Sequence, residues 1–448
     1  MFGKDKFEAL LTRALRASKA PATEVVVLAM DEYLTRFANN GIHQNVAETN
    51  VSVYFRAIDG KRAGEATTGN LTDDGLKEAA ERALLHARQQ PEDPDFPGLP
   101  DPEPIPHVEA VNEETLAFSP DQRAKAVGVM CKLAAAQGLK AFGAFTNGVY
   151  EVGMATSRGL VAYHPATQAD LQTVVMGANG SGWGEESDWK VGELDAERVG
   201  REAVEKATRA QNPRAIEPGK YTVILDPYAV QDILIWLDLA GMSALAVQEG
   251  RSWMNDRIGK QAMSPLVSIW DDGLDPAGIP MPIGFDGLPR RRVSLVDKGV
   301  IGEPVYDHAT AMKEGKQSTG HALPPFIPPW LKGPHAFNLF MAAGDQTVEE
   351  MIRSTKRGLY ITRFWYTRVV HPRDCVLTGM TRDGVMMIEN GELTFPVKNL
   401  RFTQAYVEAM ANVEAVGSVS KLLAGDSGLA LRVPALKVRD FTFTGITV

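Results

Sequence analysis

Three runs of sequence in the second half of the chain decide how that half folds. They read GKQSTGHALP (residues 315–324), NLFMAAGDQTVEEMIRSTKRGLYITRF (338–364) and ENGELTFPVKNLRF (389–402). In the middle run, Tyr360, Thr362 and Phe364 stand at every second position, which is the period of a strand. Packing in the core is one interpretation of this face. The other is a sheet edge that faces a partner or pairs with a bound chain.

An apolar helix is predicted upstream, directly after the strand expected at residues 221–225. Its sequence is DPYAVQDILIWLDLAGMSALAV (226–247), and it contains no histidine. Zinc needs several ligands that converge from fixed positions, and a helix provides two histidines on one face only at a spacing of about one turn. This helix therefore cannot hold zinc, and we expect its turn at residues 235–240 to be apolar.

The order of these runs resembles the carboxy-terminal half of the TldD/PmbA (TldE) family. That family has two kinds of subunit, one with a zinc motif HExxxH on a helix and one without it. Because the helix here has no histidine, the chain resembles the PmbA/TldE kind. In zinc-bearing relatives a cysteine near the carboxy terminus resembles a third ligand. The corresponding residues 421–433 of this chain, KLLAGDSGLALRV, contain no cysteine.

The resemblance implies a function as well as a fold. It implies a metal-free subunit of a cytoplasmic metalloprotease complex, with zinc in a TldD-like partner subunit and no cofactor in this chain. The partner's zinc-bound water and glutamate base would attack the substrate. This subunit would complete a groove for extended, unfolded peptides, and a homodimer is possible in isolation. Relatives carry the historical label modulator of DNA gyrase.

Composition sets wider limits. The chain has 448 residues, 44% hydrophobic and 23% charged, enough for two domains of about 200 residues each. Its net charge of −9 disfavours direct binding of nucleic acid. The tight basic cluster at residues 290–292 is predicted to be a solvated loop. Two distant cysteines and no apolar run of about 20 residues predict a cytoplasmic protein that does not span a membrane.

The predicted fold class is α+β with two domains, residues 1–217 and 218–448. Each domain is expected to combine an antiparallel sheet with packed helices, because neither half shows the alternating strand and helix rhythm of a parallel sheet. In the first domain, strands are predicted at residues 24–31 and 33–40 with a tight connection between them.

Turn and cap signals divide the rest of the first domain. Asp59-Gly60 predicts a hairpin turn, and Thr72 predicts the N-cap of a helix. Seven prolines between residues 91 and 106 exclude regular structure there. A second capped helix is expected to begin at Ser119.

An antiparallel meander is predicted from residue 140 to about residue 190. One of its turns is expected at Asn147-Gly148. The glycine-rich run GANGSGWGEES (177–187) is predicted to be a flexible hairpin tip, because it does not open a helix as a nucleotide-binding loop does.

The candidate site residues lie mainly in the run KQSTGHA (316–322). Ser318, Thr319 and His321 supply hydroxyls and an imidazole, so a serine nucleophile is one interpretation. A triad also needs an acid that orients the base, and the sequence ties no acid to this run. The alternatives are a turn whose hydroxyls bind their own backbone and the wall of a peptide groove or subunit contact. The predicted groove residues are Ser318, Thr319, Gly320, His321, Tyr360, Thr362 and Phe364.

Two other clusters are weaker candidates. Cys375 follows His371 and Asp374, as in a cysteine nucleophile with a base, but the apolar residues after it predict the start of a buried strand. A metal site from His308, His321 and His335 is conceivable, with Asp307 as a further ligand. Histidines in loops beside glycine and proline more often belong to turns.

The proline-rich segment LPPFIPPWLKGP (323–334) predicts a semi-rigid lid that presents Phe326, Ile327 and Trp330 to a partner. Two other functions remain open for the whole chain. One is a non-proteolytic peptide-binding or scaffold homo-oligomer, and the other is a solitary hydrolase that uses Ser318 or Cys375.

Overall fold

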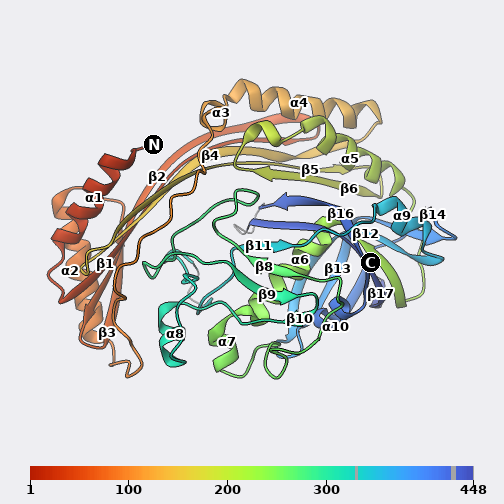
Figure 1. The fold of residues 1–448 in the computed structure, drawn as a ribbon. Helices are drawn as coiled ribbons and strands as arrows, with labels where there is room; N and C mark the ends of the chain where they lie inside the picture. Colours follow the sequence, from red (N-terminus) through yellow and green to blue (C-terminus); the bar gives the residue numbers. More distant parts are fainter. Residues whose placement is uncertain (328–330, 425–429, 447–448) are drawn as a thin grey trace.

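The computed structural model describes residues 1–327, 331–424 and 430–446. Two β-sheets dominate it, a curved sheet from the first half of the chain and a larger sheet from the second half (Figure 1). Helices pack on both sheets, so the predicted α+β class is confirmed. The division between residues 217 and 218 falls between the last helix of the first half and the first strand of the second. As a domain boundary it stays a prediction.

The first sheet is antiparallel throughout, in the order β3-β2-β1-β4-β5-β6. Its strands are β1 (Ala22–Ala38), β2 (Gly41–Asp59), β3 (Arg62–Thr68), β4 (Lys140–Thr156), β5 (Val161–Met176) and β6 (Ser181–Asp188). Four of them have 16 residues or more, long enough for strand twist to bend the sheet visibly. The sheet arches over the second half of the chain (Figure 1).

Helices cover the convex face of this arch (Figure 1). They are α1 (Lys4–Ala17), α2 (Asp73–Gln89), α3 (Glu113–Ala117), α4 (Pro120–Ala136) and α5 (Ala196–Arg209), with a 3-10 turn at Val191–Glu193. Val25, Val27 and Phe55 pack beneath α1 and α2 in one apolar cluster. Because successive side chains of a strand point to opposite faces, Glu24 and Val26 face the concave side.

The second sheet is larger and mostly antiparallel. Its strands are β7 (Gly219–Leu225), β8 (Ile269–Asp271), β9 (Val293–Asp297), β10 (Val300–Ile301), β11 (Asn338–Met341), β12 (Arg357–His371), β13 (Val376–Glu389), β14 (Glu392–Pro396), β15 (Leu400–Ala405), β16 (Val413–Leu423) and β17 (Ala430–Ile446). Two pairs, β11 with β17 and β12 with β7, are parallel. The strands β7, β12, β13, β15 and β17 form a closed ring, since β17 pairs with both β15 and β7.

Short helices accompany the second sheet. They are α6 (Pro227–Leu237), a π-helical turn (Asp238–Met242), α7 (Ala244–Gln248), α8 (His308–Lys313), α9 (Val348–Arg353) and α10 (Tyr406–Ala411). In α6, Ile233, Leu234 and Leu237 have no exposed surface and belong to the largest apolar cluster of the molecule. The predicted apolar helix is therefore confirmed, and it continues into the π-helical turn.

The helix caps, the hairpin turn and the proline-rich segment predicted in the first half are confirmed. The Thr72 side chain accepts a hydrogen bond from the Gly75 N–H and caps α2. Ser119 forms a capping box with Gln122 at the start of α4. Asp59 pairs with Arg62, so the β2–β3 hairpin turns where the sequence predicts it. The proline-rich residues 91–106 contain no helix or strand.

The two strands predicted at residues 24–31 and 33–40 are wrong as separate elements, because β1 is one continuous strand. Asp31 pairs with Thr49 of β2 on one side and with Val149 of β4 on the other. The two neighbours carry the backbone of β1 straight through its polar centre.

The turn predicted at Asn147-Gly148 is also wrong, because both residues lie inside β4. A Cβ on Gly148 would stand 2.4 Å from the Asp31 carbonyl oxygen, so the glycine permits a close approach of β1. Asn147 is 1% exposed, and its Oδ1 accepts a hydrogen bond from Arg123 Nη1 at 2.7 Å. This Asn-Gly pair serves packing and not a change of direction.

The glycine-rich run is only partly a hairpin tip. The turn occupies residues 177–180, and the remainder forms β6. A Cβ on Gly182 would lie 2.2 Å from the Ala203 carbonyl oxygen, and one on Gly184 would lie 2.5 Å from that of Val199. These glycines let the backbone of α5 lie directly on the strand.

Candidate functional site

The predicted residues Ser318, Thr319 and Gly320 lie in a tight loop after α8. Ser318 Oγ donates to Asp286 Oδ2 at 3.2 Å and accepts from the Gly320 N–H at 3.0 Å. Thr319 Oγ1 accepts from the Tyr306 N–H at 2.7 Å and donates to the Tyr306 carbonyl at 2.9 Å. Both hydroxyls are engaged within the protein, which is the geometry of a structural turn.

Gly320 and His321 complete this loop. Gly320 has a φ of 73°, and a Cβ there would stand 2.3 Å from the Pro289 carbonyl oxygen. His321 has no exposed surface. Its Nε2 lies 2.8 Å from Asp271 Oδ1, and its Nδ1 lies 2.9 Å from Thr319 Oγ1. The expectation that no acid is tied to this run is therefore wrong, because β8 brings in Asp271 from 50 residues away.

The series Asp271, His321 and Thr319 has the connectivity of an acid, base and hydroxyl triad. Its environment does not suit catalysis. The side chains of Asp271 and His321 have 0% exposure, and the Tyr306 backbone holds the Thr319 hydroxyl. We assign these residues a role in stabilising the fold.

Arg290 belongs to the same buried centre, so the prediction that the 290–292 cluster is a solvated loop is wrong for this residue. Its side chain has no exposed surface, and its Nη1 lies 3.2 Å from Asn338 Oδ1 and 3.5 Å from Asp271 Oδ1. Burial alone would raise the pKa of Asp271. His321, Arg290 and the Asn338 N–H together hold that pKa below its ordinary value.

The other three predicted residues lie elsewhere. The Tyr360 hydroxyl donates to Asp226, whose Oδ2 also lies 2.7 Å from Lys206 Nζ. Tyr360 and Thr362 line a cavity of about 560 Å³ between α5, α9, β12 and β16. Phe364 is 4% exposed and packs among the aromatic rings of the main core. The seven predicted residues therefore occupy three separate places.

The π-helical turn after α6 is packed closed, but it is not apolar throughout as the sequence predicts. Asp238 is 1% exposed, accepts from the Ala336 N–H at 3.0 Å and lies 2.8 Å from His335 Nδ1. The fully buried Trp253 donates from Nε1 to the Leu237 carbonyl at 2.7 Å. A buried Asp–His contact and an indole ring therefore fill the space around this turn.

The residues present do not fit a zinc ion. Across residues 1–327, 331–424 and 430–446, no three His, Cys, Asp or Glu side chains gather closely enough to hold a metal. His321 pairs with Asp271, and His335 pairs with Asp238. His308 is the first residue of α8, and Asp307 caps that helix. The conceivable site from these histidines is therefore not assembled.

Cys375 is fully buried at the start of β13. Its burial raises the pKa of the thiol, which is the opposite of what an activated thiolate needs. His371 instead contacts Asp374 at 3.1 Å. These contacts give no support to a cysteine nucleophile.

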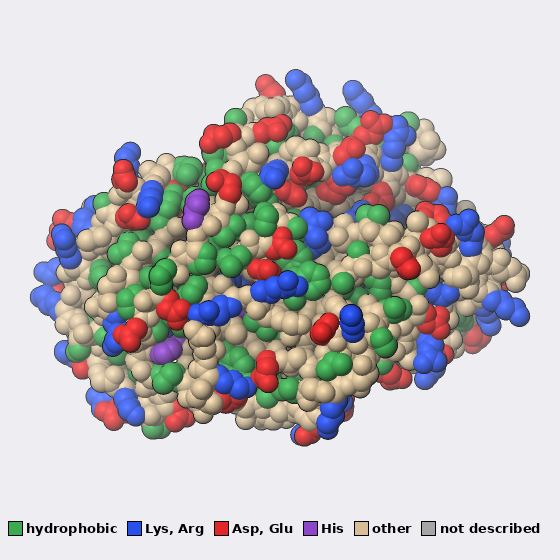
Figure 2. Space-filling view, viewed as in Figure 1, with side chains coloured by type: hydrophobic (Ala, Val, Ile, Leu, Met, Phe, Trp, Pro, Cys, Tyr) green, Lys and Arg blue, Asp and Glu red, His purple; other side chains and the backbone are tan. Residues whose placement is uncertain are grey.

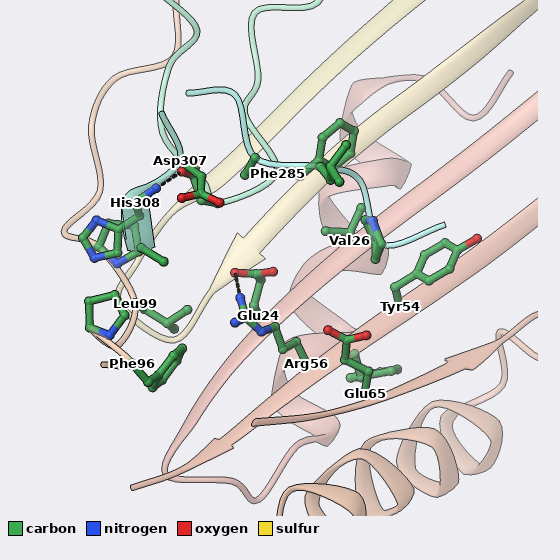
Figure 3. Close-up of a pocket in the computed structure, with 18 of the residues that line it drawn as sticks. Glu24, Val26, Tyr54, Arg56, Glu65, Phe96, Leu99, Phe285, Asp307 and His308 are labelled. Atoms are coloured by element: carbon green, nitrogen blue, oxygen red, sulfur yellow. Dashed lines mark hydrogen bonds and ion pairs between the residues drawn. The ribbon is translucent and has the colours of Figure 1, made fainter. Parts of the chain in front are cut away.

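A cavity of about 500 Å³ lies between the concave face of the first sheet and loops of the second half (Figure 3). The strands β1, β2 and β3 form one wall, and the proline-rich crossing near Phe96 and Leu99 forms another. Phe285, Asp286 and the start of α8 close the opposite side. Its size and mixed lining are those of a ligand site, so we take it as the candidate functional site.

A row of charged side chains crosses the sheet wall of this cavity. Glu24 of β1 pairs in register with Arg56 of β2, and Arg56 pairs with Glu65 of β3. Glu24 is 6% exposed, and its Oε2 lies 4.0 Å from Arg56 Nη1. Burial raises the pKa of Glu24 to about 7, with Arg56 opposing the rise and Asp286 and Glu65 adding to it.

Asp286 faces this row from the second half of the chain. It accepts hydrogen bonds from the His308 N–H at 2.8 Å and from Ser318 Oγ at 3.2 Å. Burial still raises the pKa of Asp286 to about 6, and Asp307 adds to the rise. Ser318 therefore lies behind the cavity wall and reaches the cavity only through Asp286.

The predicted lid borders the same cavity. Phe326 is 42% exposed, and its ring centroid lies 6.0 Å from that of Tyr54 and 5.9 Å from that of Phe285. Trp330 of that prediction lies outside the described residues. Its presentation to a partner stays a prediction.

The sequence reasoning missed Glu24, Asp286 and Asp271. These acids stand in separate segments, and none forms a local motif with the run around Ser318. One signal was present: the Asp59-Gly60 turn fixes the hairpin register and places Arg56 opposite Glu65.

Side chains of both signs are intermixed over the face that Figure 2 shows. This pattern agrees with a net charge of −9 and offers no broad basic field on that face. Among the described helices, none combines the length and apolar character needed to cross a membrane.

Comparison with known families identifies the class of protein. A model described as the PmbA/TldA metallopeptidase C-terminal domain matches residues 218–445, and one described as domain 1 of the same metallopeptidases matches residues 23–87. The first match covers half of the chain. This chain belongs to the PmbA/TldD family.

Relatives of both kinds are found. A protein named Metalloprotease PmbA homolog, from Haemophilus influenzae, is 23% identical over 91% of this chain and 88% of its own length. A Metalloprotease TldD homolog of the same species is 27% identical over 43% of this chain and 42% of its own length. An uncharacterized protein of Methanocaldococcus jannaschii is 34% identical over 29% of this chain and 31% of its own length. The matches to the last two span less than half of those relatives.

Solved structures share the fold. The crystal structure of TldE from Thermococcus kodakarensis superposes with a TM-score of 0.88 at 19% identity, covering 98% of this chain and all of that one. A proposed modulator of a DNA gyrase from Thermotoga maritima superposes with a TM-score of 0.84 over the same shares, also at 19% identity. At this identity the likeness establishes the fold.

Proposed function

We propose that this chain is the metal-free subunit of a TldD/TldE-type metalloprotease complex in the cytoplasm. In this proposal the zinc belongs to a TldD-like homologue, and that ion activates water for peptide hydrolysis. The present chain binds and orients an extended, unfolded peptide in a groove between its two sheets. The loop around Ser318, whose hydroxyls are hydrogen-bonded within the protein, stabilises one side of that groove.

The single observation that carries the proposal is the packing of the turn at Asp238–Met242. In the resemblance, the zinc motif of the other kind of subunit lies on this helix. Here Trp253 and the Asp238–His335 pair fill the surroundings of the turn. A metal with its water would need that volume and several of those atoms. This packing supports the assignment of zinc hydrolysis to a second chain in the proposal.

The extent of the matches to relatives favours the PmbA kind of subunit. The alignment with the H. influenzae PmbA homolog runs along nearly the whole chain, whereas that with the TldD homolog covers less than half of it. The groove is supported by the cavity of about 500 Å³ on the concave face, where side chains of both halves meet. Among the described residues that line it, we find no nucleophile hydrogen-bonded to a base, which suits a role in binding.

Co-expression with a TldD-like homologue that carries HExxxH tests the proposal. We expect the two chains to elute together in size-exclusion chromatography and to digest casein or an unfolded peptide faster than either chain alone. The matched control is the same pair with the zinc-motif glutamate of the partner replaced by glutamine, which should elute together but digest nothing. Separate elution with no gain in activity would overturn the proposal.

Metal analysis of the isolated chain provides an independent test. After purification without chelator, we expect far less than one zinc per chain by mass spectrometry of the metal content. Zinc that binds one to one and is lost on replacing His335 or His321 with alanine would contradict the argument that packing around Asp238–Met242 excludes zinc from this chain.

A further inference from the structure

One acid of the cavity, Glu24, has a distant cation but no hydrogen bond at one carboxylate oxygen. Glu24 is 8% exposed by side chain, and its Oε2 is buried without a hydrogen-bond partner among the described residues. The nearest cation, Arg56 Nη1, stands 4.0 Å away. The Arg56 guanidinium also lies 5.5 Å from the centre of the Phe96 ring, so it contacts a second group besides Glu24. An ionised carboxylate left this way in a protein interior is unfavourable unless something binds it.

Acids outnumber cations around this group. The acidic residues that line the cavity are Glu24, Glu65, Asp286 and Asp307, and the basic ones are Arg56 and Lys332. Burial lowers the pKa of His308, so its imidazole adds no positive charge at neutral pH. The cavity thus attracts a cation, and among its described lining residues Glu24 Oε2 is the buried oxygen that accepts no hydrogen bond.

The walls away from the acids are apolar. They comprise Val26, Tyr54, Phe96, Leu99, Phe285 and Leu331. Figure 3 shows the Glu24 carboxylate among these groups, facing the space between the sheet and the loops. A small hydrated cation would gain nothing from such walls, whereas an ammonium group on an apolar stem uses both features.

We propose that this cavity binds a protonated primary amine carried by a peptide, with Glu24 accepting its N–H groups and the apolar walls covering its stem. The two sources of such an amine are the N-terminal residue of the peptide and a lysine side chain. An ammonium group offers three donors, which suits the free lone pairs of Glu24 and the neighbouring acids. This inference rests on the proposed function and names what the groove recognises.

A pH dependence follows from the groups that face Glu24. These are Arg56 on β2, Glu65 on β3 and Asp286 from the second half. The raised pKa of Glu24, about 7, means that amine binding must displace a proton below that pH, so affinity falls on acidification. The N-terminal amino group of a peptide loses its own proton above about pH 8, and a lysine side chain loses its proton above about pH 10. Affinity should therefore peak between about 7 and 8 for an N-terminus and between about 7 and 10 for a lysine.

Three peptides test the proposal by calorimetric titration of the full chain. They are Leu-Ala-Ala amide, its N-acetyl form, and N-acetyl-Lys-Ala-Ala amide. We expect the free amine to bind at least about tenfold more tightly than its acetylated form, the size of one charge-assisted hydrogen bond. Recovery of affinity with the lysine peptide assigns the source to a side chain, and no recovery assigns it to the N-terminus. Equal binding of the first two peptides overturns the proposal, as does the absence of binding at millimolar concentration.

Glu24→Gln is the decisive variant, and Glu48→Gln, an exposed site on the neighbouring strand, is its matched control. Glu24→Gln should lose about tenfold in affinity for the free amine and lose the fall in affinity below pH 7. Glu48→Gln should change neither. Unchanged affinity and pH profile in a folded Glu24→Gln protein would overturn the inference. Glu65→Gln, at the end of the same row, provides a second variant with a smaller expected loss.

The outcome is separable from that of the proposed function. If the chain assembles with a zinc-bearing homologue but shows no preference for free amines, only the present inference fails. If it prefers free amines but never assembles, the cavity assignment stands and the complex does not.

Discussion

Buried acids at two places in this protein differ in their surroundings. Asp271 and Asp238, which we call the sealed acids, each contact a histidine and a backbone N–H. Glu24 in the cavity has only a long ion pair with Arg56, and its Oε2 accepts no hydrogen bond in the described structure. A fully partnered acid stabilises the fold, whereas an unpartnered one costs stability and is better explained by a ligand.

The largest effect should come from breaking a sealed acid. Asp271→Asn leaves Arg290 buried without its counter-charge and weakens the hydrogen bond to His321, so the free energy of unfolding should fall by about 3–5 kcal/mol at neutral pH. Urea denaturation measures this change. Because the folded-state pKa of Asp271 lies below its ordinary value, its contribution is present above that value. It is lost as the pH falls through the folded-state pKa, so the difference between the two proteins should shrink in acid. Equal stability of the wild-type protein and Asp271→Asn at pH 7 would contradict the distinction between the sealed acids and Glu24.

For Glu24, the acid in the cavity, we expect the opposite change in stability on substitution. The pKa of Glu24 is raised from 4.5 to about 7, so its ionised form destabilises the fold. At about 1.4 kcal/mol per unit, Glu24→Gln should stabilise the ligand-free chain by about 3 kcal/mol at pH 8. The cost of ionisation is absent below the ordinary value and complete above about 7, so the gain should vanish near pH 4. A destabilised Glu24→Gln protein at pH 8 would mean that Glu24 is a sealed acid after all.

The π-helical turn at Asp238–Met242 allows a third test, which concerns how tightly its surroundings are packed. A Cβ on Gly241 would stand 2.3 Å from Trp253 Cδ1, so Gly241→Ala should cost about 1–3 kcal/mol. Gly128→Ala is the matched control, because nothing lies within 4 Å of its Cβ position on helix α4. That control should be neutral or stabilising by under about 1 kcal/mol. Thermal unfolding compares the two. If Gly241→Ala is tolerated equally well, the turn has spare volume and the argument for a partner weakens.

The smallest effect on stability is expected at Ser318, which lies between the sealed acid Asp271 and the cavity. Ser318→Ala removes one hydrogen bond to Asp286, so unfolding free energy should drop by about 1 kcal/mol. Because that bond lowers the pKa of Asp286, the pKa should rise further above about 6 in the variant. Peptidase activity of an assembled complex should be unchanged. Abolished activity would instead revive Ser318 as a nucleophile.

Local signals predicted much of the fold. The cap at Thr72, the capping box at Ser119 and the hairpin after Asp59 depend on a few adjacent residues, which the sequence displays directly. The continuity of β1 and the strand position of Asn147-Gly148 depend on neighbours far along the chain. A strand that is held on both sides overrides a polar or glycine-containing dipeptide.

The candidate site was predictable only in its neighbourhood. The run around Ser318 does adjoin the cavity, but Ser318 contacts it through Asp286, and Tyr360 lies at a different cavity. Hydroxyls and an imidazole in one short run attract attention as chemistry, although the backbone uses them for a turn. The cavity acids come from a strand and a distant loop, and no spacing rule in one sequence joins them.

The closed ring of strands has a consequence for how the chain is made. Strand β7 is synthesised about halfway along the chain, but its hydrogen-bonding partners lie on β12 and on β17, which follow more than 100 residues later. Until β17 is synthesised, both β7 and β15 keep an unpaired edge, and such edges recruit other chains. Pairing over such long sequence separations is also slow. The yield of folded protein should therefore depend on how slowly the chain is translated and on temperature, because both affect the time before β17 closes the ring. The residues of the cavity should matter less for this yield.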